Sequence, residues 1–300
     1  PPRSTPLYSS AASDVYKRQQ VTNAGGPRAI DEVRLREGSL LRPRWPAALG
    51  MRGLTMMRML AALNGLVSSA GGGAPAAHAA YVILLLRGLA GGKSFLMSDG
   101  IGVGYGARPF ADGTDAVYFV AQENYPVEFL EAEYPARLLR YGIHLDSGGP
   151  GRHRGGCGIV REYEILADEA VLAVRIDGVV CPPWGVAGGH SGRPGRAVVN
   201  PGTPGERLLA PLSDGNRLVR GDILLIETGG GGGHGHPFDR PPEEVLSDVE
   251  GGFVSEASAA RDYGVALRGG ALDAAATALL RSDRPAAKAF HRGEYADVLG

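Results

Sequence analysis

Glycine is the residue type that most constrains this sequence, because 47 of its 300 residues are glycine and a further 21 are proline. Glycine allows tight turns and close approaches between backbones, whereas proline fixes the backbone within turns. Such a content favours strands and loops over a helical bundle. We therefore predict an α+β fold, with a β-rich body of antiparallel strands, Gly/Pro-rich loops, one helix on the N-terminal side and a short helical C-terminal tail.

Short apolar segments bounded by turn residues predict the strands of this body. In the segment GIVREYEIL, every second residue over 159–165 falls on one face of an extended chain. Such alternation is typical of half-buried antiparallel strands, and the regular turn signals favour a sandwich or a barrel-like body. The expected strands read YVILLLRG, KSFLM, AVYFVAQ, PVEFLEAEYP, RLLRYGIHL, CGIVREYEIL and AVLAVRIDG.

One helix is predicted over 51–70, where apolar residues recur at helical spacing and the glycines at 71–73 follow. This pattern is typical of an amphipathic helix that buries one side. The residues expected on the buried side are Leu54, Met57, Leu60, Ala61 and Leu63.

Three short helices are predicted in the C-terminal tail. The Pro-Pro-Glu-Glu sequence at 241–244 indicates a helix start, because proline suits the first turn and carboxylates suit the positive end of the helix dipole. The next helix begins after Ser255 as its N-cap and ends at Gly264. An Ala-rich segment from about Asp273 predicts the third helix.

The charges and cysteines argue against several classes of function. Lysine and arginine total 31 against 32 aspartates and glutamates, so the positive field that attracts nucleic acid or an anionic membrane is lacking. The two cysteines have no C-x-x-C spacing, which favours a reduced, cytoplasmic setting. The apolar run over 74–86 contains Pro75 and His78 and is too short to cross a bilayer. We expect neither nucleic acid nor a membrane as a partner.

The first 19 residues differ from the rest of the chain. They are polar, Ser-rich and aperiodic, and they resemble translated sequencing-adaptor tails. We expect residues 1–19 to be a disordered artefact and assign residues 20–300 to the folded domain.

Seven sequence blocks occur in one order between Glu37 and Val265. They read EGSLLRPRWPAALGMR, GYGARPFADGTDAV, QENYPVEFLEAEYPARLLRYGI, DSGGPGRHRGGCGIVREYEIL, PPWGVAGGHSGRPGR, ETGGGGGHGHPFDR and EEVLSDVEGGFVSEASAARDYGV. Together these blocks resemble the C-terminal half of the hydantoinase B/oxoprolinase family. This group includes N-methylhydantoinase B, 5-oxoprolinase and a large subunit of acetone carboxylase.

The resemblance implies a division of labour between two proteins. A hydantoinase A-type subunit or domain, which carries ATP and magnesium, phosphorylates the amide oxygen of a hydantoin, 5-oxoproline or another lactam. The B-type subunit then hydrolyses the activated ring. Phosphorylation turns the amide into an imidate with a good leaving group, which an activated water is able to attack. The implied assembly is a hetero-oligomer. Two alternatives remain: an acetone carboxylase-type subunit, or a non-catalytic scaffold that docks the ATP-binding partner.

The resemblance also implies a divalent metal held by histidine and aspartate motifs in the N-terminal half of the family's domain. We find no counterpart of these motifs, because the first of the seven histidines is His78. We therefore expect this chain to be truncated at its N-terminus, to hold no metal, and to be inactive alone.

Carboxylates are concentrated in the segment QENYPVEFLEAEYP. If 127–132 is a strand, Glu128 shares a face with Leu130, and a carboxylate on an inward face has to be paired or functional. We therefore consider Glu123 and Glu128 as catalytic residues and Asn124 as a substrate contact. The alternative is a structural ion-pair network with Arg137, Arg140, Arg152 and Arg154.

Two glycine loops contain candidate substrate-binding arginines. In the loop DSGGPGRHRGG, Arg152 and Arg154 are able to hold a carboxylate or phosphate bidentately. They are equally able to pair with Asp146 and hold the loop in place. In the loop GIGVGYGARP, Arg108 precedes Asp112, and this loop either lines a substrate cavity or is a plain connection.

The run Gly229–Gly233 leads into His234-Gly235-His236. Alternate histidines suit a metal if the segment is extended, and glycine N–H groups suit a phosphate. No Lys-Ser/Thr pair follows, so this is not a Walker A loop. The simplest interpretation is a turn whose glycines pack against another backbone. We also consider His236 as a substrate contact, and we assign no metal ligand.

Overall fold

The chain divides into two compact units, residues 1–52 and 53–300. The described part of the first unit contains a tight turn, in which the Gly38 N–H donates to the Arg42 carbonyl oxygen at 2.8 Å. The sheets, the glycine-rich region and the helical tail all lie in the second unit. The expected disorder of residues 1–19 lies outside the described part of this computed structural model, which covers residues 34–47, 50, 52–80, 82–118 and 124–293.

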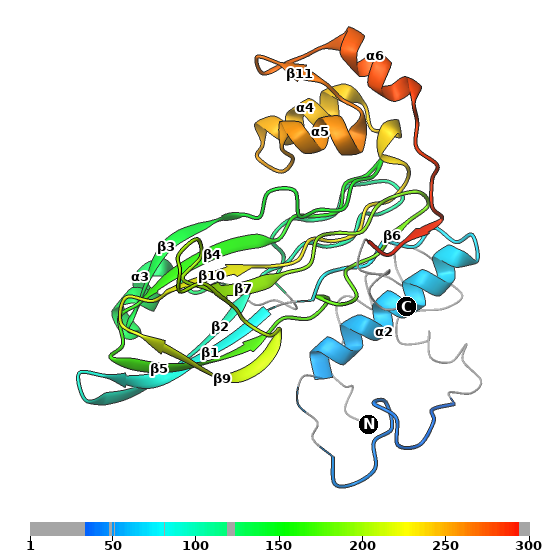
Figure 1. Ribbon diagram of the computed structural model, residues 1–300. Coiled ribbons are helices and arrows are strands. Elements are labelled where there is room, and N and C mark those ends of the chain that lie inside the picture. The colour runs from blue at the N-terminus through cyan, green and yellow to red at the C-terminus, as the bar shows by residue number, and fades with distance from the viewer. Residues whose placement is uncertain (1–33, 48–49, 51, 81, 119–123, 294–300) are drawn as a thin grey trace, which may run out of the picture. The chain divides into compact units, whose positions relative to one another are not determined.

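Two antiparallel sheets form the body of the second unit (Figure 1). This arrangement confirms the predicted α+β fold with antiparallel strands. The first sheet has the order β2-β1-β5-β9, with β1 (Val82–Ala90), β2 (Lys93–Ile101), β5 (Glu169–Arg175) and β9 (Leu212–Val219). The second has the order β3-β4-β10-β7-β8, with β3 (Ala136–Ile143), β4 (Ile159–Ile165), β7 (Arg196–Val199), β8 (Arg207–Leu208) and β10 (Ile223–Glu227).

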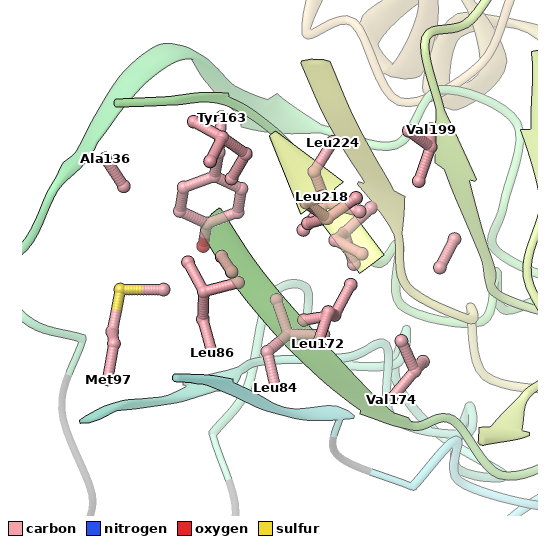
Figure 2. Packing of buried hydrophobic residues seen from close by; sticks show 14 of the residues in the cluster. Leu84, Leu86, Met97, Ala136, Tyr163, Leu172, Val174, Val199, Leu218 and Leu224 are labelled. Atoms are coloured by element: carbon pink, nitrogen blue, oxygen red, sulfur yellow. The ribbon is translucent and has the colours of Figure 1, made fainter. Parts of the chain in front are cut away.

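The core lies between these two sheets. Leu84 and Leu86 of β1 are fully buried and face Tyr163 of β4 and Leu224 of β10 (Figure 2). Burial of each such aliphatic side chain stabilises the fold by about 1.5–3 kcal/mol. The predicted inward face of β4 is confirmed, since every second residue of 159–165 is buried.

A charged pair lies inside this apolar core. The Arg161 guanidinium approaches the Asp99 carboxylate at 2.7 Å, and the Tyr163 hydroxyl donates to the same oxygen at 2.6 Å. The Arg161 and Asp99 side chains are only 2% and 1% exposed. The alternation of β4 places Arg161 inside, but nothing local in the sequence identifies Asp99 as its partner.

The segment expected to be a strand at 127–132 is a helix, α3 (Val127–Glu133), so that prediction was wrong. Pro126 precedes the helix with φ fixed at −54°, and Glu128 lies in the first turn, where a carboxylate favours the helix dipole. Only Leu130 of this helix is buried. One buried apolar residue therefore anchors the short helix. The alternation of residues in this segment does not correspond to a strand.

The predicted N-terminal helix exists as α2 (Arg52–Ser69), but its expected buried side is confirmed only in part, and Leu54 is half-buried. Met57 and Ala61 are buried, whereas Leu60 and Leu63 are 49% and 56% exposed. The helix packs through a narrow ridge that ends at Gly65, where a Cβ would lie 3.2 Å from the Trp184 ring. Gly65 allows this close approach, whereas Leu60 and Leu63 lie on the exposed side of the helix.

The segment 229–235 runs through the centre of a bundle of extended chains, called here the glycine bundle. Its successive N–H groups donate to different neighbouring segments, and the segments 190–193 and 153–156 each accept again three residues further along. This spacing resembles a polyproline II-type helix, which has three residues per turn and no internal hydrogen bonds. The donor–acceptor pairs are Gly230–Arg193, Gly231–Gly156, Gly232–Ala77, Gly233–His190, His234–His153 and Gly235–Val186, at 2.8–3.1 Å.

Glycine is required where these backbones approach most closely. A Cβ on Gly231 would lie 2.1 Å from the Tyr105 carbonyl oxygen, and a Cβ on Gly104 would lie 1.8 Å from the Gly156 carbonyl oxygen. No side chain fits at such distances. The interpretation of glycines packed against other backbones is thus confirmed, although the segment is extended instead of forming a turn.

The three helices predicted in the tail are present as α4 (Pro242–Glu250), α5 (Glu256–Tyr263) and α6 (Ala274–Ser282). Ser255 caps α5 by accepting from the Ser258 N–H at 3.1 Å, and Gly264 ends it with φ at 61°. The helical tail, defined here as residues 237–282, also contains the short helix η2 (Pro237–Asp239) and the hairpin of β11 (Leu267–Arg268) and β12 (Ala271–Leu272).

The helical tail has a small apolar core of its own, formed by Val245, Val254, Ala259, Tyr263 and Val265. It lies at one end of the body, whereas α3 lies at the other end (Figure 1). Beyond the tail, β13 (Phe290–His291) pairs with β6 (Gly185–Val186) and returns the chain to the glycine bundle. This return brings His291 beside residues from the middle of the chain.

Candidate functional site

A cavity of about 650 Å³ lies where the glycine bundle meets the helical tail. This volume is typical of sites for small molecules. Four segments that are distant in the sequence form its walls: the loop at 146–150, the loop at 190–194, one side of α5 with the residues before it, and the end of β13. Four of its side chains carry formal charge, namely Asp146, Arg193, Arg261 and Asp262.

Two histidine rings stack in the wall of this cavity. The rings of His190 and His291 lie 4.7 Å apart with an angle of 18° between their planes. The backbone N–H groups of Ser191 and Gly293 each donate to Nδ1 of His291 at 3.1 Å, so this nitrogen acts as an acceptor. Burial, with the adjacent His291, lowers the pKa of His190 to about 4, so its ring is neutral at pH 7.

The acidic residue Asp146 is held in an unusual backbone conformation at the cavity. Its φ is 60°, in the left-handed region that non-glycine residues adopt rarely and mainly when their surroundings require it. One carboxylate oxygen accepts from the Ser255 N–H at 2.7 Å, just before α5 begins. This hydrogen bond therefore links the loop at 146–150 to the helical tail.

A cluster of arginines and carboxylates behind this cavity joins the helical tail to the glycine bundle. Arg154 contacts Asp115 with two hydrogen bonds, at 2.8 and 3.2 Å, and Asp248 of α4 at 3.4 Å. Arg240 contacts Asp112 twice at 2.8 Å and Asp248 at 2.9 Å. Asp248 thus bridges both guanidinium groups.

The pKa values within this cluster follow from burial and pairing. Burial alone would lower the pKa of Arg154, but its hydrogen bonds with Asp115 and the nearby negative charges outweigh burial and raise it. Burial raises the pKa of Asp248 despite the two arginines beside it. Burial alone would also raise the pKa of Asp112, yet the hydrogen bond from Arg240 makes the net shift downward. The two guanidinium groups therefore stay charged.

The predicted alternative in which Arg152 and Arg154 pair with Asp146 was wrong about the partner. Arg154 pairs with Asp115 and Asp248, and its side chain is 5% exposed. Arg152 pairs with Glu244 of α4 at 3.0 Å and remains partly exposed. Their role as substrate contacts stays a prediction, and of the two Arg152 is the one accessible from solvent.

The other candidate residues at this end of the molecule have defined places. The Arg108 guanidinium lies 5.6 Å from the centroid of the exposed Phe110 ring and donates to the Asp112 carbonyl oxygen at 3.3 Å. Nδ1 of His236 accepts from the Phe238 N–H at 3.0 Å and caps η2, while its Nε2 lies 3.0 Å from the Pro285 carbonyl oxygen. His236 is buried, so both ring nitrogens are engaged in holding the chain.

Of the two acidic candidates, Glu128 lies on α3, at the opposite end of the body (Figure 1). Glu128 is exposed on α3, and none of the ion pairs found in the described part of the chain includes it. Asn124 donates through Nδ2 to the Tyr141 hydroxyl at 2.5 Å. Glu123 lies outside the described residues. The structure therefore does not bring Glu128 and Asn124 together with Arg152, Arg154 and His236.

The sequence analysis missed the residues that line the cavity, His190, Arg193 and His291, as well as Asp248 and Arg240 in the cluster. His190 follows two glycines and precedes a serine, which is a weak signal. His291 lies near the end of the chain in a polar segment. Only pairing between β6 and β13 places the two rings in contact.

Residues 34–47, 50, 52–80, 82–118 and 124–293 contain no group of three or more His, Cys, Asp or Glu side chains placed to hold a metal ion. The donors in this part of the chain therefore do not fit a divalent metal ion. No helix in the same part of the chain has the length and hydropathy needed to cross a membrane.

Comparison with known proteins defines the class to which this fold and sequence belong. The model of the hydantoinase B/oxoprolinase family matches residues 7–237. The putative B subunit of a D-/L-hydantoinase from Pseudomonas sp. (strain NS671) is 36% identical over 166 residues, covering 54% of this chain and 28% of that protein. The beta subunit of the caprolactamase from Pseudomonas jessenii is 34% identical over 189 residues, covering 58% of this chain and 31% of that protein.

A solved structure supports the same relationship. The crystal structure of the ATP-dependent caprolactamase from Pseudomonas jessenii superposes with a TM-score of 0.59 and 27% identity, covering 68% of this chain and 38% of that chain. The chain therefore belongs to the hydantoinase B/oxoprolinase family. It spans 28% and 31% of the length of the two relatives named above.

Proposed function

We propose that this chain is the C-terminal part of a B-type subunit in an ATP-dependent hydrolase of cyclic amides. The observation that carries the proposal is the family match over residues 7–237, together with relatives named as the B subunit of a hydantoinase and the beta subunit of a caprolactamase. Those relatives act on cyclic amides according to their names. The substrates of the subunit containing this chain are taken to fall in the same class, namely hydantoins, 5-oxoproline or related lactams.

The proposed reaction divides between two proteins. An A-type partner transfers the γ-phosphoryl group of ATP, with magnesium, to the amide oxygen of the ring. Water then adds to the activated carbon, the C–N bond breaks, and phosphate leaves, so a lactam opens to a carboxylate and an amine, and a hydantoin opens to a carboxylate and a urea group. The names of the two relatives, which denote a B and a beta component, support a hetero-oligomer with such a partner. We assign this assembly to the cytoplasm.

In this proposal, the chain contributes one wall of the site that binds the small molecule. Its cavity of about 650 Å³ offers charged and neutral hydrogen-bonding groups fixed on rigid backbones. The glycine bundle holds the loops at 146–150 and 190–194 through backbone hydrogen bonds, for example from the His190 N–H to the Pro150 carbonyl oxygen at 2.7 Å. Such fixed positions orient a bound molecule at little further cost in ordering.

The test is a coupled assay of the full-length protein that contains this chain, co-expressed with an A-type subunit. We expect phosphate release that depends on hydantoin, 5-oxoproline or caprolactam and is matched by ring opening. Release that depends instead on a ketone with bicarbonate would replace this proposal with a carboxylase function.

A matched variant separates catalysis from scaffolding. In Arg152→Gln the exposed ion pair with Glu244 is lost while the buried cluster around Arg154 is untouched. If Arg152 contacts substrate, the KM for the cyclic amide rises while the assembly with the A-type subunit is unchanged in size-exclusion chromatography. Unchanged kinetics in this variant and in Arg154→Lys would favour a scaffold role for this part of the protein.

A further inference from the structure

The charged groups that line the cavity divide into a compensated pair and two uncompensated residues. Arg261 and Asp262 contact each other at 2.9 and 2.6 Å, so their charges compensate within the cavity wall. Among the ion pairs of the described residues, none includes Arg193 or Asp146, although both line the same cavity. Within this described part of the chain, the cavity therefore presents one cation and one anion without a partner of opposite charge.

The neutral groups of the cavity do not alter this balance. The lowered pKa of His190 keeps its ring neutral at physiological pH, and Nδ1 of His291 is already an acceptor for two backbone N–H groups. Ser191 and Ser258 add hydroxyl groups to the wall. These groups supply hydrogen bonds but no charge, so the electrostatic preference of the cavity depends on Arg193 and Asp146.

We infer that this cavity binds a small zwitterion, with its carboxylate at Arg193 and its ammonium group at Asp146. Arginine is the preferred partner of carboxylates, and an aspartate oxygen accepts from an ammonium group. Asp146 has an oxygen to offer, because only Oδ1 is engaged by the Ser255 N–H. A ligand with a single charge would leave one of the two residues uncompensated, whereas a zwitterion satisfies both.

The chemistry of ring opening identifies a natural zwitterion of this class, and this step rests on the proposed function. Among the proposed substrates, a simple lactam such as caprolactam is neutral. When water adds to its carbonyl carbon and the C–N bond breaks, the carbon becomes a carboxylate and the nitrogen takes up a proton to become an ammonium group. The cavity is thus suited to the ring-opened amino acid in preference to the closed ring.

The test measures binding to this chain alone, without ATP or a partner, by isothermal titration calorimetry and NMR shift changes. The zwitterions are 4-aminobutyrate, 5-aminopentanoate and 6-aminohexanoate. Hexanoate, hexylammonium and caprolactam are the controls with one charge or none. We expect at least one zwitterion to bind about tenfold or more tightly than each control, a difference of about 1.4 kcal/mol. Equal binding of zwitterions and controls, or no binding of any zwitterion, would overturn the inference.

Two variants assign the ends of the ligand. Arg193→Gln removes the cation, so the zwitterion should bind no better than hexylammonium. Asp146→Asn removes the charge but keeps an oxygen for the Ser255 N–H, so the zwitterion should bind no better than hexanoate. Arg217→Gln, on the exposed face of β9, is the matched control and should leave every affinity unchanged. Retained preference in both cavity variants would contradict the assignment.

This design separates the inference from the proposed function. If zwitterions bind but the full-length enzyme shows no amide-dependent phosphate release, the binding site stands and the amidohydrolase proposal fails. If the enzyme opens cyclic amides but this chain does not distinguish zwitterions from the controls, the function stands and the site inference fails.

Discussion

The body of two sheets, called here the sandwich, and the glycine bundle belong to one compact unit, yet each is held together by a different kind of interaction. In the sandwich, large side chains from two sheets fill the space between them, as with Leu84 and Tyr163 (Figure 2). In the bundle, backbones touch and hydrogen bonds run between neighbouring extended chains, for example from the Gly232 N–H to the Ala77 carbonyl oxygen at 2.9 Å. The comparison teaches that a missing side chain is as specific a structural requirement as a large one.

The largest expected effect comes from adding a methyl group to the bundle. In Gly231→Ala the new Cβ would lie 2.1 Å from a backbone oxygen that cannot move without displacing its own hydrogen bonds. We expect the free energy of unfolding to fall by about 5 kcal/mol, at the extreme of single substitutions. Urea unfolding measures this loss. Gly142→Ala is the control, because nothing lies within 4 Å of its Cβ position; equal loss in both variants would contradict the packing argument.

Removing one member of the buried Arg161–Asp99 pair tests whether the core between the sheets accepts a charged side chain only when it is paired with the opposite charge. Arg161→Met leaves the Asp99 carboxylate buried, with the hydrogen bond from the Tyr163 hydroxyl but without its ion pair. We expect a loss of about 3–5 kcal/mol, because an unpaired buried charge is strongly destabilising. The double variant Asp99→Leu/Arg161→Met should recover at least about 1 kcal/mol of this loss. A double variant less stable than the single one would refute the explanation.

Removing a side chain from the sandwich should have a smaller but clear effect. Leu84→Ala removes apolar atoms from a fully buried position and leaves a cavity. We expect a loss of about 3 kcal/mol in unfolding free energy, measured by urea titration. Leu89→Ala, on the same strand but 50% exposed, should cost less than about 1 kcal/mol. Similar losses at both positions would show that the inward face of β1 does not carry the packing.

The smallest expected effect concerns pH and the histidine stack at the edge of the bundle. The pKa of His190 is about 4 in the folded chain and 6.5 for an ordinary histidine. Between these values the unfolded chain binds more protons, so stability should decline as pH falls from about 6.5 to 4. His190→Asn cannot titrate, and the difference between the two proteins should reach on the order of 2 kcal/mol. Parallel stability–pH curves would exclude His190 as a cause.

Local sequence signals predicted many elements because the forces that form them act over a few residues. Ser255 caps α5 and Gly264 ends it because both interactions lie within one helical turn. The alternation along β4 identified its inward face for the same reason. The segment at 127–132 was misjudged, because a short helix anchored by Leu130 and a strand with alternate apolar residues share the same local pattern.

The candidate site was less predictable than the fold. Glu128 and the candidate arginines lie at opposite ends of the body, and Arg154 is paired with Asp115 and Asp248 instead of Asp146. Ion-pair partners separated by 39 and 94 residues leave no local trace in the sequence. The cavity residues were missed for the same reason, since His190 and His291 meet only through the pairing of β6 with β13.

Composition and short-range pattern thus established a glycine-rich α+β fold, its helix caps and its resemblance to one family, because these depend on neighbouring residues. Which side of α2 is buried, which glycines tolerate no methyl group and which charges lack a partner were decided by long-range packing. These features depend on distances of a few ångströms between segments far apart in the chain. Such distances exist only after the sheets and the bundle have assembled.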